Sequence, residues 1–300
     1  MKLWTTIVAA CCIVALGYAQ EPLQTLRVDV ELVQVYASVT DVMGRYVKDL
    51  KRDAFQVFED GVEQKVEAFS ADDVPISLGI VLDVGGTMKP NLAIAREGAL
   101  TFLKAGHLSN EYFLVEFNNK AEITEDFTRS LQALRNRTTF LPATRDKAVW
   151  DGMYIALDKL RRSSNPRKAL LVQTTGGTLT GLHKPAEVRE LARKLDVQIF
   201  GVELPLEANV SGEIGSVERP ASEILESVGG INHVASSGAD YLNICLRLSI
   251  AMRNQYAIAY RSSNSTHDGK FRRVRVKLNP PKGTPELFVN TREGYFAPES

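Results

Sequence analysis

The chain has 300 residues, 44% of them hydrophobic, and its 36 basic and 36 acidic side chains give a formal net charge of zero. A balanced charge creates no strong field toward nucleic acid or an anionic membrane, so the composition excludes binding driven by bulk charge. The length suits one large domain or two smaller ones, because domains cluster near about 100–150 residues.

The N-terminus reads MKLWTTIVAACCIVALGYAQEP and predicts an export signal. Lys2 precedes an apolar run over residues 7–16, which is shorter than the roughly 20 residues that a membrane-spanning helix needs. Small residues end at Ala19, as a signal peptidase requires. We expect residues 1–19 to be a cleaved signal peptide and the mature chain to be periplasmic or secreted, without a membrane span. A retained anchor and lipoprotein processing at Cys11 are the alternatives.

The cysteines predict no internal disulfide bond. Cys11 and Cys12 lie in the predicted leader, which leaves Cys245 alone in the mature chain. This residue lies in the apolar stretch YLNICLRLSIAM, so we expect it to pack in the core. A reactive thiol is the alternative interpretation.

Residues 20–75 carry the pattern of β-strands. Apolar and polar residues alternate over 26–41, with a slip near 33–35 that predicts a bulge. Phe55–Phe58 is a short predicted strand, Glu59-Asp60-Gly61 a hairpin turn, and 62–69 the single return strand.

The rhythm changes over residues 76–252, where strands alternate with helices. An apolar run over 76–84 is typical of a strand that helices cover on both faces. The alternation predicts βαβ units and a mostly parallel sheet. The other predicted strands are 112–117, 169–174, 197–203 and 231–235, and the predicted helices are 90–105, 131–137, 147–161, 185–194, 222–228 and 240–253.

Residues 253–300 return to β-strands, at 256–260, 271–278 and 286–290. An unpaired β flank would expose strand edges, so we expect the two flanks to form one small sandwich with the α/β domain inserted between them. The stretch FRRVRVKL alternates, which favours a strand with one solvated basic face over a nucleic-acid patch. That interpretation places four basic residues on the face, namely Arg272, Arg273, Arg275 and Lys277.

The stretch LGIVLDVGGTMKP (78–90) places Asp83 at the end of the first buried strand, where open α/β sheets bind ligands. Asp-x-Gly-Gly-Thr resembles the phosphate loop of the sugar kinase and actin superfamily. A kinase of that class needs a second phosphate loop, an adenosine loop and duplicated domains, and its Asp loop leads into hairpin strands. Here a helix is predicted next, and ATP is scarce outside the cytoplasm. An actin-like sugar kinase is therefore the outlying alternative.

The order of elements resembles a von Willebrand factor type A domain, in which the first strand ends in a metal loop and a helix follows. More specifically, the chain is similar to a family of secreted bacterial von Willebrand factor A-related proteins. The resemblance covers nearly all of the mature chain and implies that the β flanks accompany the inserted domain. The matching stretches are LVQVYASVTDVMGRYV, LKRDAFQVFEDGVEQKVEAF, AVWDGMYIAL, LESVGGI, MRNQYAIAY, DGKFRRVRVKL and REGYFAP.

The resemblance also implies a metal-ion-dependent adhesion site, whose usual ligands are an Asp and two Ser, then a Thr, then an Asp. Asp83 matches the first Asp, and Thr87 matches the second Ser. Gly85 stands at the first Ser, Lys147 at the Thr and Thr175 at the last Asp. A divalent ion beside a lysine at about 4 Å would be repelled by several kcal/mol. We therefore expect a degenerate site without a cofactor; if Mg²⁺ binds at all, Asp83 and Thr87 are the expected ligands.

Two roles are open for Lys147. It neutralises Asp83 by a salt bridge where the metal would lie, or it points to solvent from the start of its helix, with Asp146 or Thr144 as substitute ligands. The function that we expect is non-catalytic binding of a protein or other macromolecule, through the loops around Asp83 or through a flat face of the sandwich. A structural or assembly role without a ligand there is the alternative. The partner's identity is not written in the sequence.

Overall fold

The computed structural model describes residues 32–136, 148–175, 181–204, 225, 231–280 and 283–298, and Leu32–Ser300 forms one compact unit. The predicted signal peptide over residues 1–19 and the beginning of the first predicted strand lie outside the described residues. So does the predicted helix 222–228, except for Leu225, which is helical. The expected fold class is confirmed: an α/β domain of von Willebrand factor A type is inserted into a small β-sandwich.

The α/β domain is built on a six-stranded sheet in which every pairing is parallel except that of β6 with β7. The central strand β5 is buried at every residue, as its continuous apolar sequence predicts. The antiparallel edge strand β7 was not predicted, because its sequence AEITEDFT is half polar and only partly buried. In sheet order the strands are β10 (Ile231–Val234), β9 (Val197–Glu203), β8 (Arg167–Thr174), β5 (Ile76–Asp83), β6 (Glu111–Phe117) and β7 (Ala121–Thr128).

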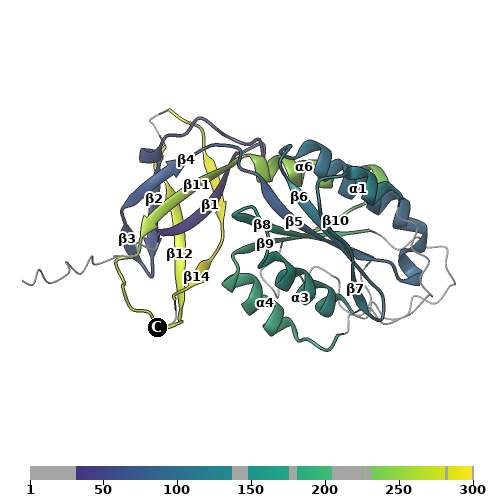
Figure 1. Cartoon of the computed structure of the whole chain (residues 1–300). Helices are drawn as coiled ribbons and strands as arrows, with labels where there is room; N and C mark the ends of the chain where they lie inside the picture. The colour runs from purple at the N-terminus through teal and green to yellow at the C-terminus, as the bar shows by residue number, and fades with distance from the viewer. Residues whose placement is uncertain are drawn as a thin grey trace, which may run out of the picture. The chain divides into compact units, whose positions relative to one another are not determined.

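Helices cover both faces of this sheet (Figure 1). One face carries α1 (Leu92–Ala105) and α6 (Gly238–Arg253), together with the short helices η2 (Gly86–Asn91) and α2 (Leu131–Asn136). The other face carries α3 (Val149–Leu160) and α4 (Pro185–Lys194).

Helices α1 and α6 approach closely at a glycine. A Cβ atom at Gly98 would lie 2.4 Å from the ring of Tyr241 and 3.0 Å from the sulfur of Cys245, so a larger residue does not fit. Cys245 is completely buried here, which confirms its predicted place in the core. Burial raises the pKa of its thiol to about 12, which favours packing over thiol reactivity.

The sandwich consists of two antiparallel sheets to which both ends of the described chain contribute (Figure 1). The 3₁₀ turn η1 (Arg52–Ala54) leads into its second strand. One sheet is β13 (Leu287–Thr291), β1 (Leu32–Asp41), β11 (Gln255–Arg261) and β4 (Val66–Ser70). The other is β14 (Gly294–Phe296), β12 (Phe271–Leu278), β2 (Phe55–Glu59) and β3 (Val62–Gln64).

Two predictions in the sandwich are wrong. The return strand 62–69 is divided at Lys65, because β3 pairs with β2 in one sheet while β4 pairs with β11 in the other. The slip near 33–35 is not a bulge, since β1 pairs with β11 in unbroken register from Leu32 to Ser38. The pattern slips because Leu32 is 45% exposed, whereas Val33, Val35, Ala37 and Val39 all face the sandwich core.

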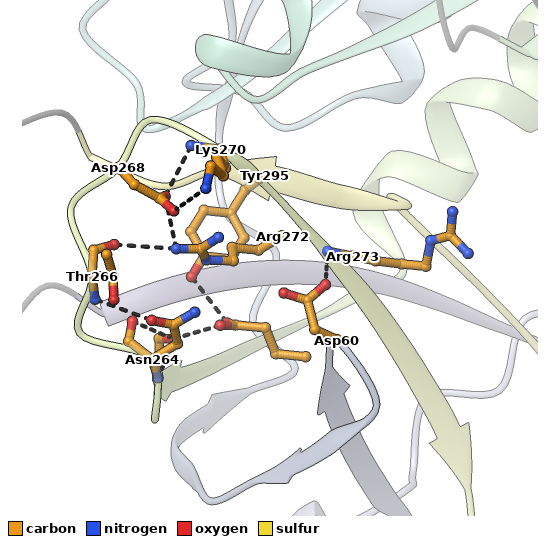
Figure 2. A network of polar contacts seen from close by, with 10 residues as sticks. Asp60, Asn264, Thr266, Asp268, Lys270, Arg272, Arg273 and Tyr295 are labelled. Atoms are coloured by element: carbon orange, nitrogen blue, oxygen red, sulfur yellow. Dashed lines mark hydrogen bonds and ion pairs between the residues drawn. The ribbon is translucent and has the colours of Figure 1, made fainter.

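The basic strand β12 is also corrected in one respect. Arg273, Arg275 and Lys277 are exposed, as predicted, whereas Arg272 lies on the valine face and is 6% exposed. Figure 2 shows its guanidinium group inside a polar network, where it donates to a carboxylate oxygen of Asp268 at 2.8 Å. Strict alternation puts this arginine with the valines, and the nearby carboxylate compensates its buried charge.

Candidate functional site

The candidate site lies at the carboxyl edge of the parallel sheet. Strands β5 and β8 are neighbours there and end at Asp83 and Thr174, which brings their following loops together. The backbone N–H of Val84 donates to the carbonyl oxygen of Phe117 at 2.8 Å, so the loop after β5 is also tied to the end of β6. The strand order therefore places the predicted residues of the first and third loops at one edge.

Asp83 is completely buried, and both of its carboxylate oxygens accept hydrogen bonds from this chain. Oδ1 accepts from the backbone N–H of Gly85 at 2.9 Å, and Oδ2 accepts from the hydroxyl group of Thr174 at 2.9 Å. Gly85 has no side-chain oxygen and takes part through its backbone alone. A buried carboxylate needs such donors, since leaving its oxygens unpaired would cost several kcal/mol.

The loop hydroxyl groups form a second contact beside the carboxylate. Oγ1 of Thr87 lies 3.1 Å from Oγ1 of Thr175, so one of them donates to the other. Thr175 is 3% exposed, whereas Thr87 is exposed at the surface. Thr87 is therefore the residue of this group that a partner can reach directly.

The structure thus brings Asp83, Gly85, Thr87 and Thr175 together, while Lys147 lies outside the described residues. Sequence reasoning missed Thr174, whose hydroxyl group donates to Asp83. Its signal was its place as the last residue of a buried strand, next to the predicted Thr175.

Sequence reasoning also missed a second anchor, at the start of helix α3. Asp151 accepts from the backbone N–H groups of Leu182 at 3.0 Å and His183 at 2.9 Å, and its Oδ1 lies 2.8 Å from Nδ1 of His183. The imidazole ring stacks on Tyr154 at 3.7 Å between centroids. Burial acts to raise the pKa of Asp151, but these hydrogen bonds outweigh it and hold the pKa below its usual value. Asp151 therefore fixes the end of the loop that leads from β8 to α4.

The donor chemistry of the edge can be compared with that of a cation site. In the part of the chain that the structure describes, no three His, Cys, Asp or Glu side chains gather as a potential metal-binding group. The contacts of Asp83 include those with the backbone N–H of Gly85 and the hydroxyl group of Thr174.

Helices of the described ranges give no membrane-spanning candidate, since none of them combines the necessary length with an apolar sequence.

No protein-family model matches the sequence, and no curated protein matches it either. Among solved structures, similar ones include a von Willebrand factor type A protein from Catenulispora acidiphila, at 10% identity and a TM-score of 0.48, covering 82% of this chain and 74% of that one. Proximal thread matrix protein 1 from the mussel byssus matches at 16% identity and a TM-score of 0.48, covering 65% and 49%.

The PilB minor pilin from Streptococcus sanguinis matches at 11% identity and a TM-score of 0.45, covering 61% of this chain; the present chain therefore spans 62% of that pilin's length. These TM-scores lie below 0.5, so the assignment of the fold rests on the strand order and helix layers described above.

Proposed function

We propose that this chain is an exported, non-catalytic module of the von Willebrand factor A type, with a degenerate metal-ion-dependent adhesion site. It binds a protein or other macromolecular partner through the loops at the carboxyl edge of its parallel sheet. The observation that most directly supports a degenerate metal site is that both carboxylate oxygens of Asp83 accept hydrogen bonds within the chain, from Gly85 and from Thr174. The edge is held together by the chain itself and presents Thr87 at its surface.

The donor set at this edge does not fit Mg²⁺. That cation requires near-octahedral oxygen ligands and in proteins is held by carboxylates together with waters. Asp83 offers one carboxylate that is already engaged on both oxygens, Gly85 offers no side-chain ligand, and Thr175 stands where the resemblance implies a second carboxylate. We include in the proposal that Lys147 supplies the positive charge opposite Asp83.

Titration calorimetry with Mg²⁺ and Mn²⁺ tests the metal-free part of the proposal. We expect no heat of binding in the micromolar range, for the wild type or for Asp83→Asn. Micromolar affinity that disappears in Asp83→Asn would contradict the degenerate site.

Partner capture tests the binding function. We compare Thr87→Lys with the matched control Ser109→Lys, because Ser109 is equally exposed but precedes β6 at the opposite edge of the sheet. The proteins captured from the host's envelope or culture fluid by the wild type should be lost with Thr87→Lys and retained with Ser109→Lys. Equal capture by both variants would favour the structural or assembly role.

A kinase of the actin-like class is the remaining alternative, and it rests only on the Asp-x-Gly-Gly-Thr pattern from Asp83 to Thr87. ATP at about 100 times its dissociation constant would stabilise such a protein by about 2.7 kcal/mol. We expect no shift in the midpoint of thermal unfolding on addition of MgATP.

A further inference from the structure

A cleft of about 960 Å³ lies far from Asp83, between the outer face of the sandwich sheet and the β10–α6 side of the α/β domain. Its sandwich wall includes side chains of β1 and β13, and its other wall includes residues of α4, β9, β10 and α6. A volume of roughly 300–1,000 Å³ is typical of sites for small organic ligands. The cleft is therefore large enough for a small ligand, and none of the residues around Asp83 lines it.

The charges that line the cleft do not cancel completely. Two of the arginines have carboxylate partners, since Arg292 pairs with Asp196 at 2.5 Å and Arg193 with Glu293 at 3.5 Å. The third, Arg247, is exposed and makes no ion pair with any residue in the described ranges. One positive charge of the lining is therefore available to an anion.

Arg247 also faces the neighbouring polar groups of the cleft. Burial is the main cause that lowers the pKa of His233, and the charge of Arg247 lowers it further. Burial raises the pKa of the Tyr46 phenol, and the same charge partly opposes that rise. Both side chains line the cleft together with Arg247. The positive charge of Arg247 therefore acts on groups inside the cleft as well as on the solvent.

Two further donors in the lining have no acceptor. The hydroxyl group of Thr291 and Nε of Arg292 are buried and have no hydrogen-bond partner within the described part of the chain. Buried polar groups in native proteins are nearly always paired with protein, water or a ligand. Both atoms are covered by the chain itself, so they add polar character to this wall without being open to a ligand directly.

Apolar side chains complete the lining. Phe288 on β13 is 52% exposed, Ile231 on β10 is 43% exposed and Ile250 on α6 is 38% exposed. Large apolar side chains that gather in a concave, partly polar surface are typical of ligand sites.

We propose that this cleft binds an organic anion that carries an apolar body, with the anionic group held by Arg247 and the body packed against Phe288 and Ile231. The apolar walls bury the body, and the exposed guanidinium group of Arg247 selects a negatively charged head group. This site is independent of the loops around Asp83, so either proposal can fail without the other.

Fluorescence titration of the full chain with two probes tests the proposal. 1-Anilinonaphthalene-8-sulfonate carries the required anionic group, and N-phenyl-1-naphthylamine is a similar aromatic probe without charge. We expect saturable binding of the sulfonate. Arg247→Gln should weaken it about tenfold, equivalent to about 1.4 kcal/mol, and should change the affinity for the uncharged probe by less than about twofold. Phe288→Ser should weaken the binding of both probes.

Arg275→Gln is the matched control, because Arg275 is exposed on the solvated face of β12 and does not line the cleft. Circular dichroism checks that each variant remains folded. Absence of saturable binding to the wild type would overturn the proposal. So would an equal loss of sulfonate affinity in Arg247→Gln and Arg275→Gln, which would show only general attraction to positive charge.

Discussion

Two buried carboxylates, one in each part of the fold, are stabilised by hydrogen bonds from different kinds of donor. Asp83 at the sheet edge is 0% exposed, and Glu59 in the sandwich is 2% exposed. Glu59 accepts hydrogen bonds from three hydroxyl groups, those of Tyr260 at 2.8 Å, Tyr295 at 2.9 Å and Ser262 at 2.5 Å. Asp83 accepts from one backbone N–H and one hydroxyl group.

The difference lies in what each carboxylate connects. The partners of Glu59 lie 201, 203 and 236 residues away along the chain, so this side chain ties the N-terminal strands of the sandwich to its C-terminal strands. Two partners of Asp83 lie 2 and 91 residues away, on its own loop and at the end of the neighbouring strand β8. We therefore expect Glu59 to contribute to global stability and Asp83 chiefly to the local order of the loops.

The largest expected effect is that of Glu59→Ala, which removes the acceptor of the hydroxyl groups of Tyr260 and Tyr295, while that of Ser262 can still donate to the carbonyl oxygen of Asn264. Because each unsatisfied buried group costs about 1–3 kcal/mol, the free energy of unfolding should fall by about 3 kcal/mol or more, as measured by urea denaturation. Glu63→Ala on the exposed strand β3 is the control and should cost less than about 0.5 kcal/mol. Equal losses in the two variants would show that the buried network contributes nothing.

Asp83→Ala should have a smaller effect on the free energy of unfolding, about 2 kcal/mol, because the backbone N–H of Gly85 and the hydroxyl group of Thr174 lose their acceptor at the edge of the fold. Hydrogen exchange sharpens the comparison with Glu59→Ala. The backbone N–H of Gly85 should exchange faster in Asp83→Ala by more than the global loss of stability explains. If the exchange of Gly85 changes only in proportion to global stability, Asp83 has no special role in ordering its loop.

Removing single donors compares the two networks at the level of one hydrogen bond. Tyr260→Phe should cost about 1.5 kcal/mol and Thr174→Val about 1 kcal/mol, because each deletes one hydroxyl that donates to a buried carboxylate. The same urea denaturation measures both variants. A double variant Glu59→Ala/Tyr260→Phe should lose less than the sum of the single losses, since the two groups interact directly. Additive losses would contradict that coupling.

The smallest expected effect is the pH dependence that Tyr295 of the sandwich contributes to stability. The pKa of Tyr295 is raised from 10.0 to about 12. Burial is the main cause, and the hydrogen bond to Glu59 and the charge of Glu59 raise the pKa further. A raised pKa in the folded state means that the protonated phenol stabilises the fold. Its contribution is fully present below pH 10 and is lost as the pH rises through about 12.

Denaturation of the wild type and Tyr295→Phe across this range measures that contribution. The advantage of the wild type should be constant below pH 10 and should shrink between pH 10 and about 12. An advantage that does not change with pH would show that Tyr295 ionises as freely in the folded state as in the unfolded state.

The sequence by itself predicted the type and order of most elements. Continuous apolar runs identified strands that are covered on both faces, such as β5, and the change of rhythm at both ends of the α/β domain predicted the inserted arrangement. It also predicted that Asp83 and Thr175 lie at one edge, because the carboxyl ends of parallel strands meet there. Whether Lys147 faces Asp83 stays a prediction.

Only the tertiary structure decided which strands pair and which side chains form hydrogen bonds with one another. The division of 62–69 between two sheets and the three hydroxyl donors of Glu59 depend on contacts with residues that are remote in sequence. Periodicity records which face of an element is buried, because that choice is made residue by residue along the element. It does not record what covers that face, because the partner is set by the packing of the whole chain.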